Sequence, residues 1–173
     1  MDTYEAIATK LDVREFAQKR VPDETRRKIL EAARLTGSSM NTQHWRFVLV
    51  QDRSNLALLA SDGTTGRWVA DADFAVIILT NPKVPGYKID AGRVLQDMEL
   101  AAWNFGIASC LFTGMKGDDL RRDFKVPPEL EISTVLGFGY PREKILGKKD
   151  RKPIEEIVFL EVYGRQLDAK DRA

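Results

Sequence analysis

The chain has 173 residues, of which 43% are hydrophobic and 31% are charged. This apolar content suffices for one ordinary core, so we expect a single domain over residues 1–173. The net charge is +1, from 27 basic and 26 acidic residues, which gives no electrostatic basis for binding nucleic acid or an anionic membrane surface.

The cysteine and histidine content excludes two further classes of site. A single cysteine, Cys110, cannot form an internal disulfide, and a single histidine, His44, rules out a Cys/His zinc site within one subunit, so we expect no metal. The N-terminus lacks the basic and apolar regions of a signal peptide, and the longest apolar stretch, residues 100–115, is too short and interrupted to cross a bilayer. We therefore expect a soluble, cytoplasmic protein without a membrane partner.

Hydrophobic periodicity and turn residues predict the elements in chain order. An N-terminal helix is followed by a helix over 23–36, which stops at Gly37. Compact β-branched runs over 45–51 and 73–80 fit buried strands of one sheet. Apolar residues three and four apart mark a long helix over 88–105; a strand (107–114), a short helix (117–124) and a strand (131–141) follow. This order, with room for a helix between the first two strands, favours an α+β fold with helices on both faces of one sheet.

The turn between the second helix and the first strand combines small and amide-bearing residues. The sequence GSS at 37–39 lets the backbone pass close to a flat ligand, and Asn41 and Gln43 offer the paired donors and acceptors that read heterocycle edges. An ordinary capped turn explains the same residues. His44 fits a structural or surface role, and Trp45 fits either a core aromatic or a stacking platform.

Two charged segments are candidates for holding an anion. In KLDVREF (10–16), Lys10 and Arg14 flank Asp12, and two cations at a short turn can hold a phosphate. In GKKDRKP (147–153), Lys149 and Arg151 are two residues apart in an extended loop, so both can point the same way. Solvated surface charge is the competing interpretation of each segment.

These segments occur in an order that resembles the nitroreductase family of flavin mononucleotide (FMN) enzymes. KLDVREF is similar to the family signature Arg-Arg-Ser-x-Arg-x-Phe, and GSSMNTQHWRF (37–47) to Pro-Ser-x-x-Asn-x-Gln-Pro-Trp-x-Phe. AAWNFGIAS (101–109) is similar to Ala-Ala-x-x-x-Gly-x-x-Ser, and GYP (139–141) and RKPIEE (151–156) to a Gly-Tyr-Pro turn and an Arg-x-Pro-Leu-Glu-Glu stretch. The resemblance extends from Thr3 to Gly164.

The resemblance implies a nitroreductase-like fold, with a central mixed β-sheet flanked by helices, and an intertwined homodimer with two FMN sites at the subunit interface. By position, Arg14 approaches the pyrimidine edge of the flavin, Thr113 and Gly114 present backbone N–H groups near its N5 atom, and Arg67 is a further contact. The residues implied at the phosphate are Lys10, Leu11, Asp12, Lys149 and Arg151. Those implied in the turn from the partner subunit are Gly37, Ser38, Ser39, Asn41 and Gln43.

The implied reaction needs no catalytic side chain that attacks the substrate. NADH or NADPH gives hydride to flavin N5, and a small-molecule acceptor, such as a nitroaromatic or a quinone, then takes the electrons. A fixed guanidinium at Arg14 stabilises the negative charge of the reduced flavin. A dimeric flavin-binding protein without turnover, and a flavin-consuming or dehalogenating branch of the fold, are the alternatives.

The sequence departs from the family signatures at three positions. Leu11 stands for an arginine, Asp12 for the serine and His44 for the proline before the tryptophan. A carboxylate at about 4 Å from a phosphate is repelled by roughly 1 kcal/mol even in water. We therefore expect Asp12 to pair with Lys10 or Arg14 while Lys149 and Arg151 carry the phosphate.

Overall fold

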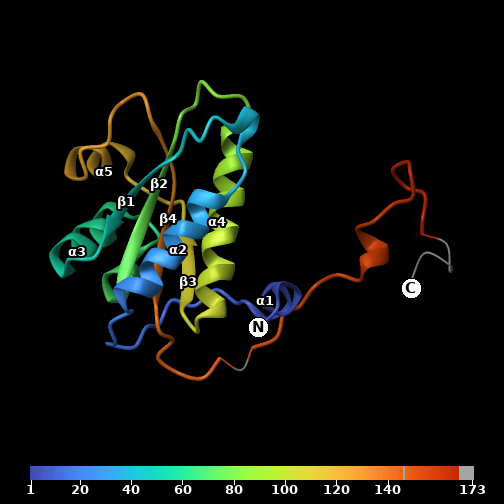
Figure 1. Ribbon diagram of the computed structural model, residues 1–173, viewed down its shortest axis with the longest axis horizontal. Helices are drawn as coiled ribbons and strands as arrows, with labels where there is room; N and C mark the ends of the chain where they lie inside the picture. The colour runs from blue at the N-terminus through green and yellow to red at the C-terminus, as the bar shows by residue number, and fades with distance from the viewer. Residues whose placement is uncertain (146, 168–173) are drawn as a thin grey trace.

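The computed structural model describes residues 1–145 and 147–167, and every element expected from the sequence is present (Figure 1). The observed ends differ from the expected ones by one or two residues. The helices are α1 (Thr3–Thr9), α2 (Asp23–Leu35), α3 (Arg53–Asp62), α4 (Tyr87–Asn104) and α5 (Gly117–Asp123). The strands are β1 (Arg46–Val50), β2 (Phe74–Thr80), β3 (Ala108–Phe112) and β4 (Glu131–Gly139). Short 3-10 turns lie at η1 (Ser39–Asn41), η2 (Arg67–Asp71) and η3 (Ile154–Glu156).

The four strands form one sheet in the order β1-β2-β4-β3. All pairings between these strands are antiparallel, with Ile77 opposite Val48 on one side and Val135 on the other. The mixed character that the resemblance implied is limited, in the described residues, to a parallel bridge between Asp12 and Ser109 at the edge of β3. Strand direction could not be derived from the sequence because a connection that contains a helix can return the chain to the sheet in either sense.

The central strand β2 explains why helices cover both faces. Its even-numbered residues, such as Val76, lie in one apolar cluster with α2 and α4. Its odd-numbered residues, such as Ile77, lie in a second cluster with α3 and α5. All seven residues of β2 are buried, and all but Thr80 are apolar, as a strand covered on both faces requires. On the α2 and α4 face, Phe74 stacks on Phe138 with ring centroids 4.8 Å apart.

Helix α4 is the longest element, and it positions the candidate site. Its apolar stripe, which includes Val94, Met98 and Ala102, packs on the sheet and against α2. The same helix buries two carboxylates, those of Asp90 and Glu99, each at most 3% exposed. None of the helices in the described ranges has both the length and the apolar composition needed to cross a membrane.

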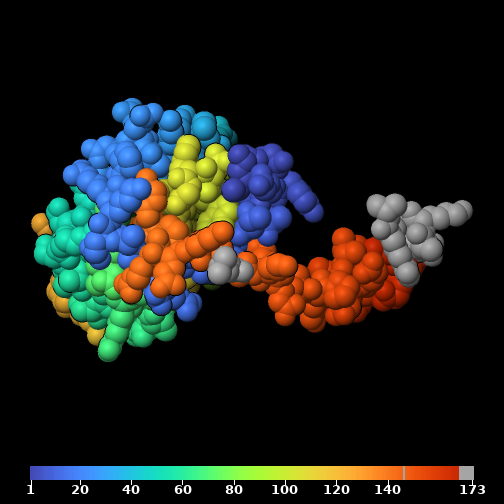
Figure 2. All heavy atoms as spheres, turned by 90° about the horizontal axis from the view of Figure 1, so that it is seen from below, coloured from blue at the N-terminus to red at the C-terminus, as the bar shows by residue number. Residues whose placement is uncertain are grey.

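After β4 the chain leaves the body and continues as an arm, defined here as residues 152–167. Figures 1 and 2 show this arm, in orange and red, running away from the rest of the protein. It exposes several large apolar side chains, namely Ile154, Ile157, Val158, Val162 and Tyr163. Such a row of apolar side chains outside the core is characteristic of a segment that packs against another surface.

One buried carboxyl group at the end of α3 leads to a prediction about stability. The Oδ2 atom of Asp62 is buried and, among the described residues, lacks a hydrogen-bond partner. Burial raises the pKa of Asp62, and the nearby carboxylates of Asp123 and Asp119 raise it further. A raised folded-state pKa means that the folded protein binds the proton more tightly, so stability falls as the pH rises from the ordinary aspartate range through the folded-state value.

We expect Asp62→Asn to raise the free energy of unfolding at pH 7 by about 1 kcal/mol, because it removes a buried charge that lacks a partner. The gain should disappear below about pH 4, where an ordinary aspartate is itself protonated. Urea unfolding at both pH values measures this difference. Asp71→Asn, at an exposed position, is the control and should change little. A gain for Asp62→Asn that persists at low pH would contradict the electrostatic explanation.

Candidate functional site

The segment that follows α1 is held by a buried network of charges. The Nζ atom of Lys10 donates to Asp12 Oδ1 at 2.5 Å and to Glu99 Oε1 at 2.7 Å. The Ser109 hydroxyl donates to the same Glu99 oxygen at 3.0 Å. Burial disfavours the charged lysine, but the hydrogen bonds to the two carboxylates outweigh it and raise the pKa of Lys10. The expectation that Asp12 pairs with a neighbouring cation is confirmed, and that cation is Lys10.

The same segment runs along the edge of the sheet. The Val13 N–H donates to the carbonyl of Ser109 at 3.0 Å, which adds the segment to the free side of β3. Arg14 is exposed and lies beside the buried thiol of Cys110. Burial raises the pKa of Cys110, and the Arg14 guanidinium acts in the opposite direction. Arg14 is thus anchored through its backbone neighbours while its charge faces solvent.

The second cationic segment reaches the first. A Cβ atom added at Gly147 would lie 2.9 Å from Leu11 Cδ1, so the backbone at Gly147 lies against the Leu11 side chain. Lys149 Nζ donates to the carbonyl of Ile7 in α1. Arg151 is exposed, and its Nη1 donates to the neighbouring carbonyl of Asp150 at 2.7 Å. The structure therefore brings Gly147 to Leu11 and Lys149 to the adjoining helix α1, although these residues are far apart in the sequence.

Three further candidate residues gather at the other end of β3. The carbonyl of Gly114 accepts a hydrogen bond from the Thr64 N–H at 2.7 Å. A Cβ atom at Gly114 would lie 2.5 Å from Thr64 Oγ1, so this close approach of two loops requires glycine. Thr113 and Arg67 are both exposed at this end. Since a strand rises roughly 3.3 Å per residue, Thr113 lies about 13 Å along the edge from Ser109.

A hollow of about 310 Å³ opens beside Thr113, between α4 and the ends of β3 and β4. Its lining includes Ala91, Leu95, Leu111, Thr113 and Ile132, so most of its surface is apolar. Apolar hollows with a few polar groups are the usual form of small-molecule sites. The hollow gives a flat, apolar ligand a place next to the sheet edge that carries the candidate residues.

The turn that carries Gly37, Ser38, Ser39, Asn41 and Gln43 lies beside the N-terminal end of α4, away from Glu99 and the Lys10 segment. The Ser39 N–H donates to Asp90 Oδ2 at 2.8 Å, and Gln43 N donates to Ser38 Oγ at 2.9 Å. Helix α4 rises about 1.5 Å per residue, so Asp90 and Glu99 are about 13 Å apart along it. Within one chain the turn and the Lys10 segment are thus held at separate places.

His44 and Trp45 are both buried. Trp45 is 5% exposed and lies in the cluster with α2 and α4, so it is a core aromatic. His44 has Nε2 at 3.1 Å from Asp90 Oδ2, and its Nδ1 accepts from the Asn81 N–H at 3.2 Å. Because Nδ1 is the acceptor, the proton resides on Nε2 and is donated to Asp90. Of the structural and surface roles expected for His44, the buried contacts show the structural one.

Asp90 and Glu99 are the site residues that sequence analysis missed. A signal was available, because Asp90 is at helical spacing with Val94 and Met98 in the apolar stripe of α4. A charged residue inside such a stripe is almost always buried with a partner. Burial tends to raise the pKa of Asp90, but hydrogen bonds from Ser39 and His44 outweigh it, so the pKa is lowered.

The exposed hydrogen-bond donors of these segments can be compared with the phosphate and ring carbonyl groups of a flavin nucleotide. Arg14 and Arg151 are exposed cations, and no ion pair to either occurs within the described ranges. Asp12 is paired with Lys10, which lessens its repulsion of a phosphate although Glu99 shares the same ammonium group. A guanidinium with unused donors suits either a phosphate or a heterocycle carbonyl. These residues fit FMN, while the described residues hold no cluster of three or more His, Cys, Asp or Glu side chains suited to a metal.

The fold is that of an α+β protein whose sheet is covered by helices on both faces, and comparison with known proteins narrows it to one family. The chain belongs to the nitroreductase family, whose model matches residues 7–76 and 67–140. It is 31% identical over 152 residues to a protein of Methanothermobacter thermautotrophicus provisionally named NADH dehydrogenase/NAD(P)H nitroreductase. That alignment covers 83% of this chain and 79% of the relative.

Solved structures show the same fold. An FMN-dependent nitroreductase from Clostridium difficile superimposes with a TM-score of 0.83 at 23% identity, covering 90% of this chain and 96% of that one. A protein of Desulfovibrio desulfuricans, provisionally named a nitroreductase and solved in complex with FMN, gives a TM-score of 0.83 at 22% identity. It covers 94% of this chain and 98% of its own.

Proposed function

We propose that the protein is an FMN-dependent oxidoreductase of the nitroreductase type, which takes hydride from NADH or NADPH and passes electrons to a small-molecule acceptor. The observation that carries the proposal is the meeting of two cationic segments at the edge of β3, where Leu11 contacts Gly147 and Lys149 reaches α1. Family membership and the FMN named for two of the structural relatives support the same cofactor.

The side chains divide the work of holding FMN. Lys149 and Arg151 bind the phosphate through charge-assisted hydrogen bonds. Lys10 is engaged by two carboxylates, so its part is to hold Asp12 by an ion pair and not to bind the phosphate itself. Arg14 meets the pyrimidine edge of the ring, where a fixed positive charge stabilises the reduced flavin. The backbone at Thr113 and Gly114 borders the ring, with Arg67 nearby. FMN itself supplies the hydride chemistry.

The site is proposed to be completed by a second copy of the chain. The turn with Gly37, Ser38, Ser39, Asn41 and Gln43 is anchored on Asp90 and the Lys10 segment on Glu99, about 13 Å apart along α4, and the family resemblance assigns the turn at this ring to the partner subunit. The exposed apolar side chains of the arm suit the surface of a partner subunit. A homodimer in the cytoplasm, with neither nucleic acid nor membrane as partner, is the arrangement we propose.

The acceptor is proposed to be a flat aromatic molecule such as a nitroaromatic or a quinone. The hollow beside Thr113 is lined by apolar residues of α4 and β3, including Leu95 and Leu111. A nicotinamide ring and an aromatic acceptor are of similar size and apolar character, so each can occupy the same place in turn. This is what a two-step exchange of donor and acceptor requires.

The decisive experiment starts from the colour of the purified protein. We expect yellow protein with a flavin absorbance spectrum, FMN on extraction, and bleaching on anaerobic addition of NADH or NADPH. Addition of a nitroaromatic or a quinone should then restore the oxidised spectrum. Bound flavin that no nicotinamide reduces would indicate a binding protein, loss of FMN during turnover would indicate a flavin-consuming enzyme, and absence of flavin binding would refute the proposal.

A further inference from the structure

The turn at residues 37–43 adopts an unfavourable backbone conformation. Met40, Asn41 and Gln43 have φ values of 52°, 54° and 47°. Non-glycine residues rarely occupy this left-handed region, and clusters of them persist only where surrounding contacts impose them. Something outside the turn must therefore hold it in place.

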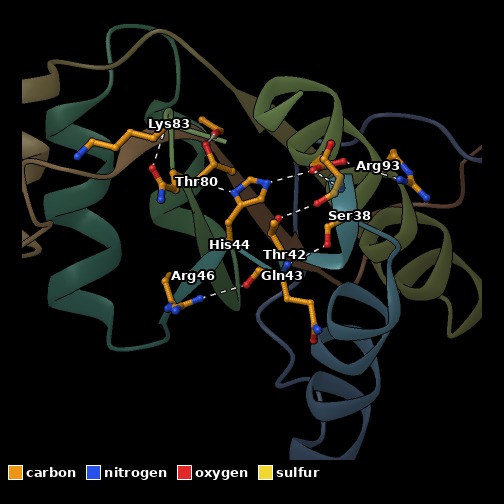
Figure 3. Close-up of polar contacts among 12 residues, drawn as sticks. Ser38, Thr42, Gln43, His44, Arg46, Thr80, Lys83 and Arg93 are labelled. Atoms are coloured by element: carbon orange, nitrogen blue, oxygen red, sulfur yellow. Dashed lines mark hydrogen bonds and ion pairs between the residues drawn. The ribbon is translucent and has the colours of Figure 1, made fainter. Parts of the chain in front are cut away.

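The holding contacts converge on one carboxylate in the first turns of α4. Asp90 is 1% exposed, and its Oδ2 accepts both the Ser39 N–H and the Nε2–H of His44. His44 in turn accepts the Asn81 N–H, which ties the end of the turn to the loop after β2. Figure 3 shows the His44 ring at the centre of this network, between the turn that carries Ser38 and Thr42 and the loop that carries Lys83. Asp90 therefore fixes both ends of the strained turn.

The N-terminal part of α4 packs closely against the turn. A Cβ atom at Gly37 would lie 2.6 Å from Arg93 Nη2, and one at Gly86 would lie 2.7 Å from Ser39 Oγ. Arg93 Nη1 also lies 3.8 Å from Asp90 Oδ1. The N-terminal turns of α4 thus lie against the turn at residues 37–43, and Asp90 links the helix to it.

We propose that Asp90, together with His44, is a positioning residue for ligand binding: the pair holds the turn at residues 37–43 in the shape that contacts the flavin ring. This inference rests on the proposed FMN site and adds to it the residues that preorganise its ring-binding turn. The exposed atoms of Asn41 and Gln43 do the contacting, while Asp90 and His44 remain buried. A preorganised turn loses less conformational entropy on binding, so its loss should appear as weaker binding.

The test compares three variants of these two residues. Asp90→Ala removes the acceptor, and we expect it to weaken binding of FMN and of riboflavin by a similar factor of about 10 or more. Asp90→Asn keeps an acceptor oxygen in the same place and should stay within about threefold of the wild type. His44→Phe keeps the ring volume and loses both hydrogen bonds, so it should weaken both ligands by an intermediate factor.

The matched control is Asp97→Ala. Asp97 is an exposed carboxylate on the same helix that accepts a hydrogen bond from Thr36, outside the turn, and its loss should leave flavin binding unchanged. Affinities are measured by quenching of flavin fluorescence on apoprotein, and amide hydrogen exchange at Ser39 should be faster in Asp90→Ala and His44→Phe. Hydrogen exchange reports on the turn even in the absence of flavin. If the wild type bound no flavin, that result would refute the proposed function and not the role of Asp90 in holding the turn.

Three results would overturn the inference. Unchanged flavin affinity and unchanged hydrogen exchange at Ser39 in Asp90→Ala would show that the turn keeps its conformation without Asp90. Loss of FMN binding with riboflavin unaffected would place the effect at the phosphate. Equal losses in Asp90→Asn and Asp90→Ala would show that charge, and not the position of the turn, is what Asp90 supplies. Should Asp90→Ala fail to fold, His44→Phe decides through the same two readouts.

Discussion

Replacement of Glu99 by alanine should lower the free energy of unfolding by about 3–5 kcal/mol, because it leaves the buried ammonium group of Lys10 without its buried carboxylate partner. Glu99 is 3% exposed and accepts hydrogen bonds from Lys10 and Ser109. Asp12 alone remains for Lys10, and its side chain is 58% exposed. The measurement is urea unfolding of the apoprotein at pH 7.

Two companion variants separate charge from packing. Glu99→Gln keeps an acceptor for Lys10 and should cost less than Glu99→Ala. The double variant Lys10→Met with Glu99→Leu removes both buried charges and should recover much of the lost stability, since apolar replacements of a buried ion pair are often neutral. If the double variant is as unstable as Glu99→Ala, the favourable interactions of the ion pair itself, and not an unpaired charge, explain the effect.

The predictable and unpredictable parts of the fold have distinct physical origins. The run at 73–80 identified β2 because a strand buried on both faces must be apolar throughout. The spacing of Val94, Met98 and Ala102 identified α4, because the face of a helix that packs on the core is apolar. Strand direction, by contrast, depends on how β2 and β4 meet across the sheet, and no local pattern encodes it.

The candidate site shows the same division. Its two charged segments were visible in the sequence because KLDVREF and RKPIEE resemble family signatures, but their meeting at Leu11 and Gly147 is a long-range contact. His44 was expected to be structural, while its partners Asp90 and Asn81 were not identified. The distant residues that a single polar side chain contacts depend on tertiary packing, and the local patterns of one sequence do not reveal them.

The phosphate site should show the largest effect on ligand binding. Replacing Lys149 and Arg151 together with alanine should weaken FMN binding by about 100-fold or more, because charge-assisted hydrogen bonds contribute roughly 1.5–3 kcal/mol each. Riboflavin lacks the phosphate, so its affinity should change by less than about threefold. The measurement is fluorescence titration of apoprotein with each ligand at low and high salt, and the loss should shrink at high salt, where phosphate attraction is screened.

The matched control comes from the same loop. Lys148 and Lys152 flank the proposed pair and are exposed, and their replacement by alanine removes the same two positive charges. If long-range attraction alone draws FMN to the loop, both double variants should lose affinity equally. If Lys149 and Arg151 contact the phosphate, only their replacement should have a large effect, since a hydrogen bond depends on geometry whereas screened attraction depends mainly on net charge. Equal loss of riboflavin and FMN in the Lys149 and Arg151 variant would instead assign the pair to the ring, and the phosphate would then have to bind near Arg14.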